Sequence, residues 1–121
     1  MLKYAEEKIF TQEQVQQLFL SINWVSGNYP KRLCKALMNS STVLTVWDGD
    51  FLVGLIRVLD DTEMLAQIHY VLVHPDYQRK EIASKMIGYI KEKYKDFMYL
   101  EVMPEDKNNI CLLYTSDAAD D

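Results

Sequence analysis

Apolar residues recur with helical spacing near the start of the chain. They follow the i, i+3, i+4, i+7 spacing of one helix face, at Val15, Leu18, Phe19 and Ile22. Thr11 stands before them as an N-cap and Gln14 follows three residues later, which is the pattern of a capping box. The pattern predicts a helix that begins after Thr11. Residues 2–8 alternate weakly and predict an edge strand.

A second helix is predicted directly afterwards. Gly27 breaks the first pattern, and Pro30 suits the first turn of a helix that extends to about Asn39. Its inward-facing residues are expected to be Leu33, Leu37 and Met38.

The pattern then becomes that of three strands. Residues 42–47 are rich in β-branched side chains, and Asp48-Gly49 is a tight-turn signal. Residues 51–59 form a nearly continuous apolar run, as in a strand covered on both faces. Residues 60–62 make the next turn, and residues 64–73 the third strand. Strands joined by short turns predict an antiparallel meander.

Helical spacing returns beyond residue 81. Apolar residues in steps of four predict a helix, with a stripe of Ile82, Met86, Ile90 and Tyr94. Residues 97–103 predict a further strand, which Pro104 ends. Without an internal repeat or linker, the pattern indicates one domain of the α/β class.

Charge and composition exclude several classes of function. The chain has 121 residues, with 13 Lys and Arg against 18 Asp and Glu and a net charge of −5, so no nucleic-acid partner is expected. Cys34 and Cys111 lack metal-type spacing, and His69 and His74 have no clustered ligands beside them, so no metal site is expected. No signal peptide and no apolar run of about 20 residues is present, which predicts a cytoplasmic protein without a membrane partner.

The stretch from residue 70 to residue 84 carries the clearest chemical signal. It combines a strand, a short polar loop and a helix start, where unpaired N–H groups and the helix dipole attract an anion such as a pyrophosphate. Arg79 and Lys80 add full positive charges, and the small Ala83 and Ser84 allow close approach.

These residues also resemble a known family. Motif A of the GCN5-related N-acetyltransferases (GNAT) is similar to Val73, Pro75, Tyr77-Gln78-Arg79-Lys80 and Ile82-Ala83. The order of elements agrees over roughly residues 1–110. The resemblance implies a GNAT-type fold, which is a mixed, mostly antiparallel sheet flanked by helices. It also implies transfer of an acetyl group from acetyl-CoA to a primary amine, by direct attack and without an enzyme nucleophile.

The family's cofactor contacts then map onto this segment. The pantetheine arm of acetyl-CoA would pair with the backbone of Val71, Leu72 and Val73. A backbone N–H near Leu72 would polarise the thioester carbonyl, an oxyanion role. The pyrophosphate would bind N–H groups and side chains of the loop and helix, namely Gln78, Arg79, Lys80, Glu81, Ile82, Ala83 and Ser84. The acceptor would be a small-molecule or peptide amine, and a homodimer would fit.

The residues that move the proton stay open. Glu101 and Glu63 are base candidates because the family often places a carboxylate on these strands. His69 and Gln67 share a strand face, where they would touch substrate, order a water or only bridge the sheet. The aromatic side chains that either line an acceptor pocket or simply pack in the core are Trp24, Tyr29 and Trp47.

Glu81 departs from the family pattern, which has glycine at this position. A glutamate adds bulk and negative charge beside an anion site. Three alternatives stay open: a side chain that swings into solvent, a weakened cofactor site, or a sequencing error. The second alternative makes a non-catalytic module that binds CoA or another phosphate ligand a competing function.

The end of the chain does not follow the family. We expect residues 1–110 to be an incomplete acyl-CoA N-acyltransferase domain whose final helix and strands are missing. Residues 111–121 resemble the translation of a transposon-end adapter used in sequencing libraries, so we interpret them as a non-native tail. Tyr114 is therefore not proposed as a catalytic acid. On this hypothesis an inactive truncated fragment is a further alternative.

Overall fold

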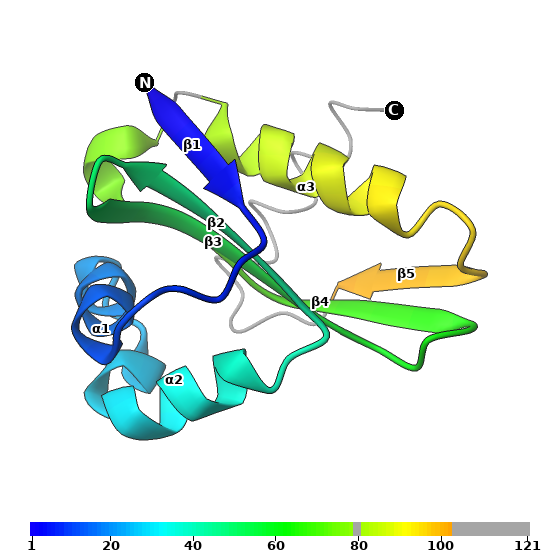
Figure 1. Ribbon diagram of the computed structural model, residues 1–121, viewed down its shortest axis with the longest axis horizontal. Helices are drawn as coiled ribbons and strands as arrows, with labels where there is room; N and C mark the ends of the chain where they lie inside the picture. The colour runs from blue at the N-terminus through cyan, green and yellow to red at the C-terminus, as the bar shows by residue number, and fades with distance from the viewer. Residues whose placement is uncertain (79–80, 103–121) are drawn as a thin grey trace.

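A computed structural model describes residues 1–78 and 81–102 of the chain. Within this part, a five-stranded sheet in the order β1-β2-β3-β4-β5 separates α3 on one face from α1 and α2 on the other (Figure 1). The elements are β1 (Leu2–Ala5), α1 (Gln12–Ser21), η1 (Val25–Asn28), α2 (Pro30–Met38), β2 (Thr42–Asp48), β3 (Phe51–Asp60), β4 (Leu65–Val73), η2 (Pro75–Tyr77), α3 (Ile82–Lys93) and β5 (Tyr99–Val102). The predicted α/β class is confirmed.

The sheet is mostly antiparallel, as expected. Strands β1 to β4 pair antiparallel with their neighbours, and β2 and β3 meet at a turn where Gly49 has φ +62°. β5 pairs parallel to β4 after the chain crosses over through α3. The predicted strands therefore form a mixed sheet, with α3 covering one of its faces.

The first two helices begin largely as their sequences predict. Thr11 caps α1, and the reciprocal bonds to Gln14 that complete a capping box are present. α2 begins at Pro30 and buries Leu33 and Leu37. The prediction that Met38 faces inward is wrong, because Met38 is 41% exposed. It follows Leu37 by one position, about 100° further round the helix.

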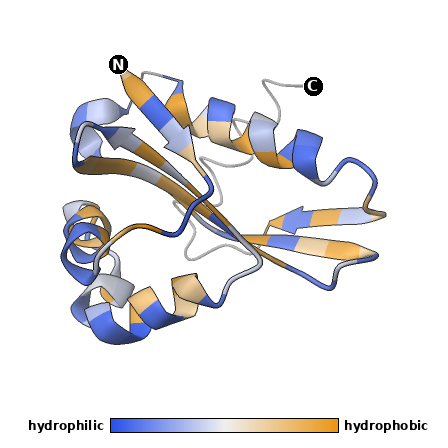
Figure 2. Ribbon diagram, in the orientation of Figure 1, coloured by the Kyte–Doolittle hydropathy of each residue, from blue (hydrophilic) through white to orange (hydrophobic). Residues whose placement is uncertain are grey.

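The two faces of the sheet bury separate apolar clusters. Figure 2 shows hydrophobic residues along the strands of the sheet and within the helices on both sides of it. One face packs against α1 and α2, with Val15, Phe19 and Leu37 among its members. The other packs against α3, with Ile82, Met86 and Ile90 among its members. The strand predicted to be covered on both faces, β3, contributes to both clusters.

A β-bulge at His69 divides β4 into two halves. Arg57 is paired with Tyr70 while the next residue of β3, Val58, is paired with Ile68, so His69 is the extra residue. Ile68 consequently belongs to the α3-side cluster, whereas Tyr70 belongs to the α1–α2 side. The bulge thus reverses the alternation of side chains just before the segment of chemical interest.

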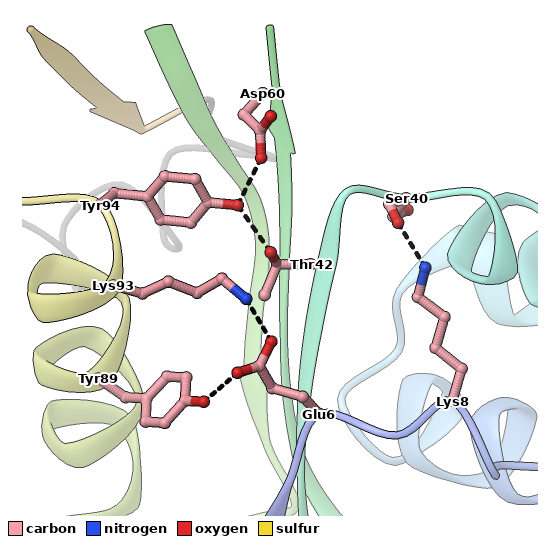
Figure 3. A network of polar contacts seen from close by, with 8 residues as sticks. All are labelled: Glu6, Lys8, Ser40, Thr42, Asp60, Tyr89, Lys93 and Tyr94. Atoms are coloured by element: carbon pink, nitrogen blue, oxygen red, sulfur yellow. Dashed lines mark hydrogen bonds and ion pairs between the residues drawn. The ribbon is translucent and has the colours of Figure 1, made fainter. Parts of the chain in front are cut away.

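Polar contacts anchor α3 to the first three strands (Figure 3). The Tyr94 hydroxyl donates to Asp60 Oδ2 at 2.6 Å and lies 2.7 Å from Thr42 Oγ1. Glu6, just after β1, accepts from the Tyr89 hydroxyl and pairs with Lys93. Burial, followed by the hydrogen bond to Asp60, raises the pKa of Tyr94 to about 12. These contacts fix the C-terminal half of α3.

Candidate functional site

The edge of β4 is only partly paired within the described residues. β3 pairs with β4 as far as Val73, but β5 pairs with it only from Leu65 to Ile68. Beyond Ile68, the side of β4 that faces away from β3 meets no described strand. This edge carries backbone donors and acceptors that an extended ligand can pair with.

The direction of each peptide group on this edge follows from the bonds near its end. His74 donates its N–H to the Val53 carbonyl at 2.8 Å, so the His74 peptide N–H faces β3. Gln78 Nε2 donates to the Val73 carbonyl at 3.2 Å, from the other side. Because successive residues alternate, Val71 and Val73 present their backbone to the open edge, and Leu72 presents its backbone to β3. The oxyanion donor assigned to Leu72 from the sequence therefore points away from the edge.

The loop after β4 is held by aromatic packing. The His74 ring lies 5.1 Å from that of Phe51 and 6.0 Å from that of Tyr77, and its Nδ1 accepts from the Asp76 N–H at 3.1 Å. The Tyr77 hydroxyl donates to Asp48 at the end of β2. The loop thus rests on the β2–β3 turn and delivers the chain to the start of α3.

The start of α3 lacks a side-chain cap. Glu81 is the N-cap residue, and its side chain makes no cap bond. Its carbonyl accepts from Lys85, the first bond of the helix, so the N–H groups of residues 82–84 have no acceptor within the helix. Ile82 is 1% exposed and packs beneath Gly54, where an added Cβ would lie 3.2 Å from Ile82 Cγ2. Burial of Ile82 therefore positions the helix start.

Glu81 adopts a left-handed conformation, with φ 61° and ψ 20°. This conformation costs a residue with a Cβ on the order of 1 kcal/mol, and glycine much less. The Glu81 side chain is exposed. The family's glycine is thus explained by backbone geometry, while the carboxylate of Glu81 lies at the surface beside the N–H groups.

Several sequence-based assignments lie outside the described residues. Arg79 and Lys80, assigned to the pyrophosphate, are among them, as are Tyr114 and the segment 111–121. Of the remaining assigned residues, Gln78 and Ser84 are exposed and Ala83 is partly buried beside the helix start.

His69 belongs to a polar cluster on the α1–α2 side of the sheet. Arg57 Nη1 lies 2.7 Å from His69 Nδ1, and Arg57 Nε donates to Ser40 Oγ at 2.8 Å. A guanidinium can only donate, so His69 Nδ1 accepts and a neutral ring carries its proton on Nε2. Burial, followed by the charge of Arg57, lowers the pKa of His69. His69 is thereby arranged to donate through Nε2, and its bond with Arg57 is of the kind expected for a residue that bridges the sheet.

Arg57 was not selected from the sequence. Its signal was available, because it is the single charged residue in the apolar run 51–59. It is half-buried, and its Cζ lies 5.5 Å from the ring centroid of Tyr70. Among the described residues, no carboxylate forms an ion pair with Arg57.

The two carboxylates that are candidates for the general base, Glu101 and Glu63, lie in different places. Glu101 is exposed on β5 and is the register partner of Gln67 on β4. Glu63 lies instead in the β3–β4 turn, where its N–H donates to Asp61 Oδ1 at 2.9 Å. Glu101 thus remains a base candidate by position, and Glu63 is a turn residue.

One of the three aromatic candidates lines a cavity. Trp24 and Trp47 are each 7% exposed and belong to the apolar core, which agrees with the packing alternative. Tyr29 lies at the rim of a cavity of about 420 Å³ between η1, α2 and β4, and Tyr70 also lines it. This cavity is on the same face of the sheet as Arg57.

Residues 1–78 and 81–102, which the structure describes, contain no group of three or more His, Cys, Asp or Glu that could hold a metal ion. None of their helices is long and apolar enough to cross a bilayer.

The chain is similar to known acetyltransferases. The profile of the acetyltransferase (GNAT) family matches residues 3–114. An uncharacterized N-acetyltransferase of Prochlorococcus marinus is 32% identical over 87 residues, which cover 69% of this chain and 48% of the relative. The chain therefore spans about half the length of this curated relative.

Solved structures share the fold. A GNAT-family acetyltransferase from Streptococcus pneumoniae has a TM-score of 0.79 and 25% identity, covering 98% of this chain and 86% of its own. An aminoglycoside N-acetyltransferase in complex with CoA has a TM-score of 0.72 over 98% of this chain and 86% of its own. At 8% identity, the second comparison supports the fold alone.

Proposed function

The chain belongs to the GNAT family of acetyltransferases, and from this premise we propose that it moves an acetyl group from acetyl-CoA to a primary amine by direct attack. One observation carries the proposal: a stretch of the β4 edge that meets no described strand is followed, after the short loop that contains η2, by a helix start without a side-chain cap. An extended arm that ends in a pyrophosphate suits both parts, because the edge offers strand-type pairing and the helix start offers N–H groups and partial positive charge.

The residues present fit the cofactor as follows. The outward backbone of Val71 and Val73 would pair with the pantetheine arm. The N–H groups of residues 82–84 would bind the pyrophosphate, together with Gln78 and with Arg79 and Lys80. Glu81 would contribute only its backbone to the pyrophosphate site. We assign the oxyanion contact to the Val71 N–H rather than to Leu72, since the alternation supports Val71 as the outward group.

For the proton of the attacking amine, position supports Glu101. It is exposed on β5 opposite Gln67, on the strand next to β4, so the acceptor amine would meet it there. His69 would orient a water or the acceptor through its Nε2–H. Localisation in the cytoplasm stays a prediction from the sequence.

The test is release of the CoA thiol from acetyl-CoA in the presence of a panel of primary amines. Amine-dependent release is expected, and Glu101→Gln is expected to lower it by about 100-fold at saturating acetyl-CoA. Glu63→Gln, an exposed carboxylate of the β3–β4 turn, serves as the matched control and should leave the rate unchanged. Equal loss in both variants would remove Glu101 from the mechanism.

One observation favours a second function, a module that binds CoA without catalysis. Glu81 brings a carboxylate and a left-handed backbone to the helix start. Binding of CoA without thiol release for any amine would select this function. Absence of both CoA binding and thiol release would leave the inactive fragment as the remaining alternative.

A further inference from the structure

The cavity on the α1–α2 side of the sheet has an unusual distribution of charge. Its volume is about 420 Å³, within the range of small-molecule sites. Residues from three elements line it, principally Val25, Ser26, Tyr29, Arg32, Leu33 and Tyr70. Among these described residues Arg32 bears the single full charge and none is acidic, although the chain as a whole has a net charge of −5.

Arg32 is available to a ligand. It is exposed, and its Cζ lies 5.7 Å from the ring centroid of Tyr29, which also lines the cavity. Within residues 1–78 and 81–102 no carboxylate forms an ion pair with Arg32. Stacking on Tyr29 orients the guanidinium while leaving its N–H donors at the cavity.

The charged side chains at the start of α2 are unfavourable for the helix dipole. Lys31 and Arg32 lie in its first turn, no acidic residue is there, and Tyr29 provides no side-chain cap. A cation at a helix N-terminus is unfavourable, by about 0.3–1 kcal/mol. An anion bound beside Arg32 would offset both cations and use the free N–H groups of the first turn.

A second cation stands behind the wall of the cavity. Arg57 lies 5.5 Å from the ring centroid of Tyr70, whose hydroxyl bonds to Ser26 Oγ at 2.7 Å. Tyr70 and Ser26 both line the cavity. Because His69 accepts from Arg57 and so adds no negative charge, the field that reaches the cavity from this side is also positive.

We infer that this cavity binds a carboxylate on the acceptor, so that the protein acts on amines that also carry a carboxylate group. That the ligand is the acceptor of an acetyl group rests on the proposed acetyl transfer. The preference of the cavity for a carboxylate can be measured independently of that reaction. Arg32 grips the carboxylate through two N–H groups, and the Ser26–Tyr70 hydroxyl pair lies in the same cavity. Amines without an anionic group leave Arg32 unpaired and bind more weakly.

The test compares two amines that differ only by the carboxylate, 4-aminobutyrate and propylamine. Their affinities for the full chain are measured by protein-observed NMR titration in the presence of CoA. One charge-assisted contact predicts about tenfold tighter binding of 4-aminobutyrate. In Arg32→Gln the two affinities should converge, whereas Lys31→Gln, the same charge change one residue away and outside the cavity lining, should retain most of the difference.

The outcomes separate the two proposals. Equal affinities in the unmodified protein, absence of binding by both amines, or equal effects of the two variants would each overturn the inference. Thiol release from acetyl-CoA is then measured with the same pair. Release that is equal for both amines would overturn the inference and leave acetyl transfer standing. A carboxylate preference in binding without any release would leave the cavity assignment standing and remove the enzymatic function.

Discussion

Helices α1 and α3 lie on opposite faces of one sheet and begin in opposite ways. α1 is closed at its start by its own side chains, because Thr11 and Gln14 exchange hydrogen bonds with the backbone and Glu13 adds a favourable charge. α3 starts at Glu81 in a left-handed conformation, without a side-chain cap. A helix start with a capping box has fewer N–H groups left for a ligand, because its own side chains occupy some of them.

The difference shows where the stability of α3 must come from. Its buried stripe and the contacts of Tyr94 and Tyr89 hold it from the side and at its C-terminal end. The first turn can then remain open to an anion at little cost to the fold.

The largest effect is expected where packing alone positions α3. Ile82→Ala should lower the free energy of unfolding by about 3 kcal/mol, because it removes a fully buried side chain beneath Gly54. Urea denaturation measures the loss. Ile9→Ala, at a position that is 65% exposed, is the control and should stay within about 0.5 kcal/mol of the unmodified chain. Similar effects of the two changes would mean that the start of α3 does not depend on burial.

The next effect concerns the far end of α3. Tyr94→Phe removes the hydroxyl that bonds to Asp60 and Thr42, and should cost about 2 kcal/mol near neutral pH. The folded pKa of Tyr94, about 12, is above its unfolded value of 10.0. The stabilisation is therefore complete below pH 10 and is lost as the pH rises towards 12. The melting temperatures of the unmodified chain and of Tyr94→Phe should converge between pH 10 and pH 12. A difference that stays constant over this range would refute the stabilising role of the Tyr94 hydroxyl.

A smaller loss is expected from opening the start of α1. Thr11→Ala removes the cap and half of the capping box, and should cost about 1 kcal/mol. Thr11→Ser keeps the hydroxyl and should restore most of this. Chemical denaturation of the three proteins gives the comparison. A neutral Thr11→Ala would show that α1, like α3, relies on its buried face.

The smallest effect has the opposite sign. Glu81→Gly should stabilise the chain by somewhat under 1 kcal/mol, because the positive φ no longer carries a Cβ. It should also tighten CoA binding by removing a negative charge beside the helix start. Glu81→Gln separates the two causes, since it removes the charge and keeps the Cβ. If CoA affinity is the same in all three proteins, Glu81 is harmless to the site.

Much of the fold could be predicted because it depends on local patterns. The capping box, the Asp48-Gly49 turn and the helical stripes involve neighbours within a few residues, so composition and period were sufficient to find them. The inward prediction for Met38 is wrong because hydrophobicity alone does not specify the helical angle, which turns Met38 away from the buried face of Leu37. The motif residues of the β4–α3 segment were equally local.

Other features depend on residues brought together from distant positions. The direction of the Leu72 peptide depends on pairing with β3, which a single strand does not specify. The donor role of His69 depends on Arg57, twelve positions earlier in the chain, and on the bulge that puts both on one face.

The sequence by itself determined the class of fold, the order of its elements and the family, since periodicity and the loop motif are properties of contiguous residues. Only the tertiary structure decided which backbone groups of β4 meet no described strand, and that Glu81 occupies a left-handed start of α3. It also decided that Arg32 is the single charged residue among the described residues that line the cavity. Strand register and side-chain contacts across a sheet arise from packing between distant segments, and that packing decides what is left open for a ligand.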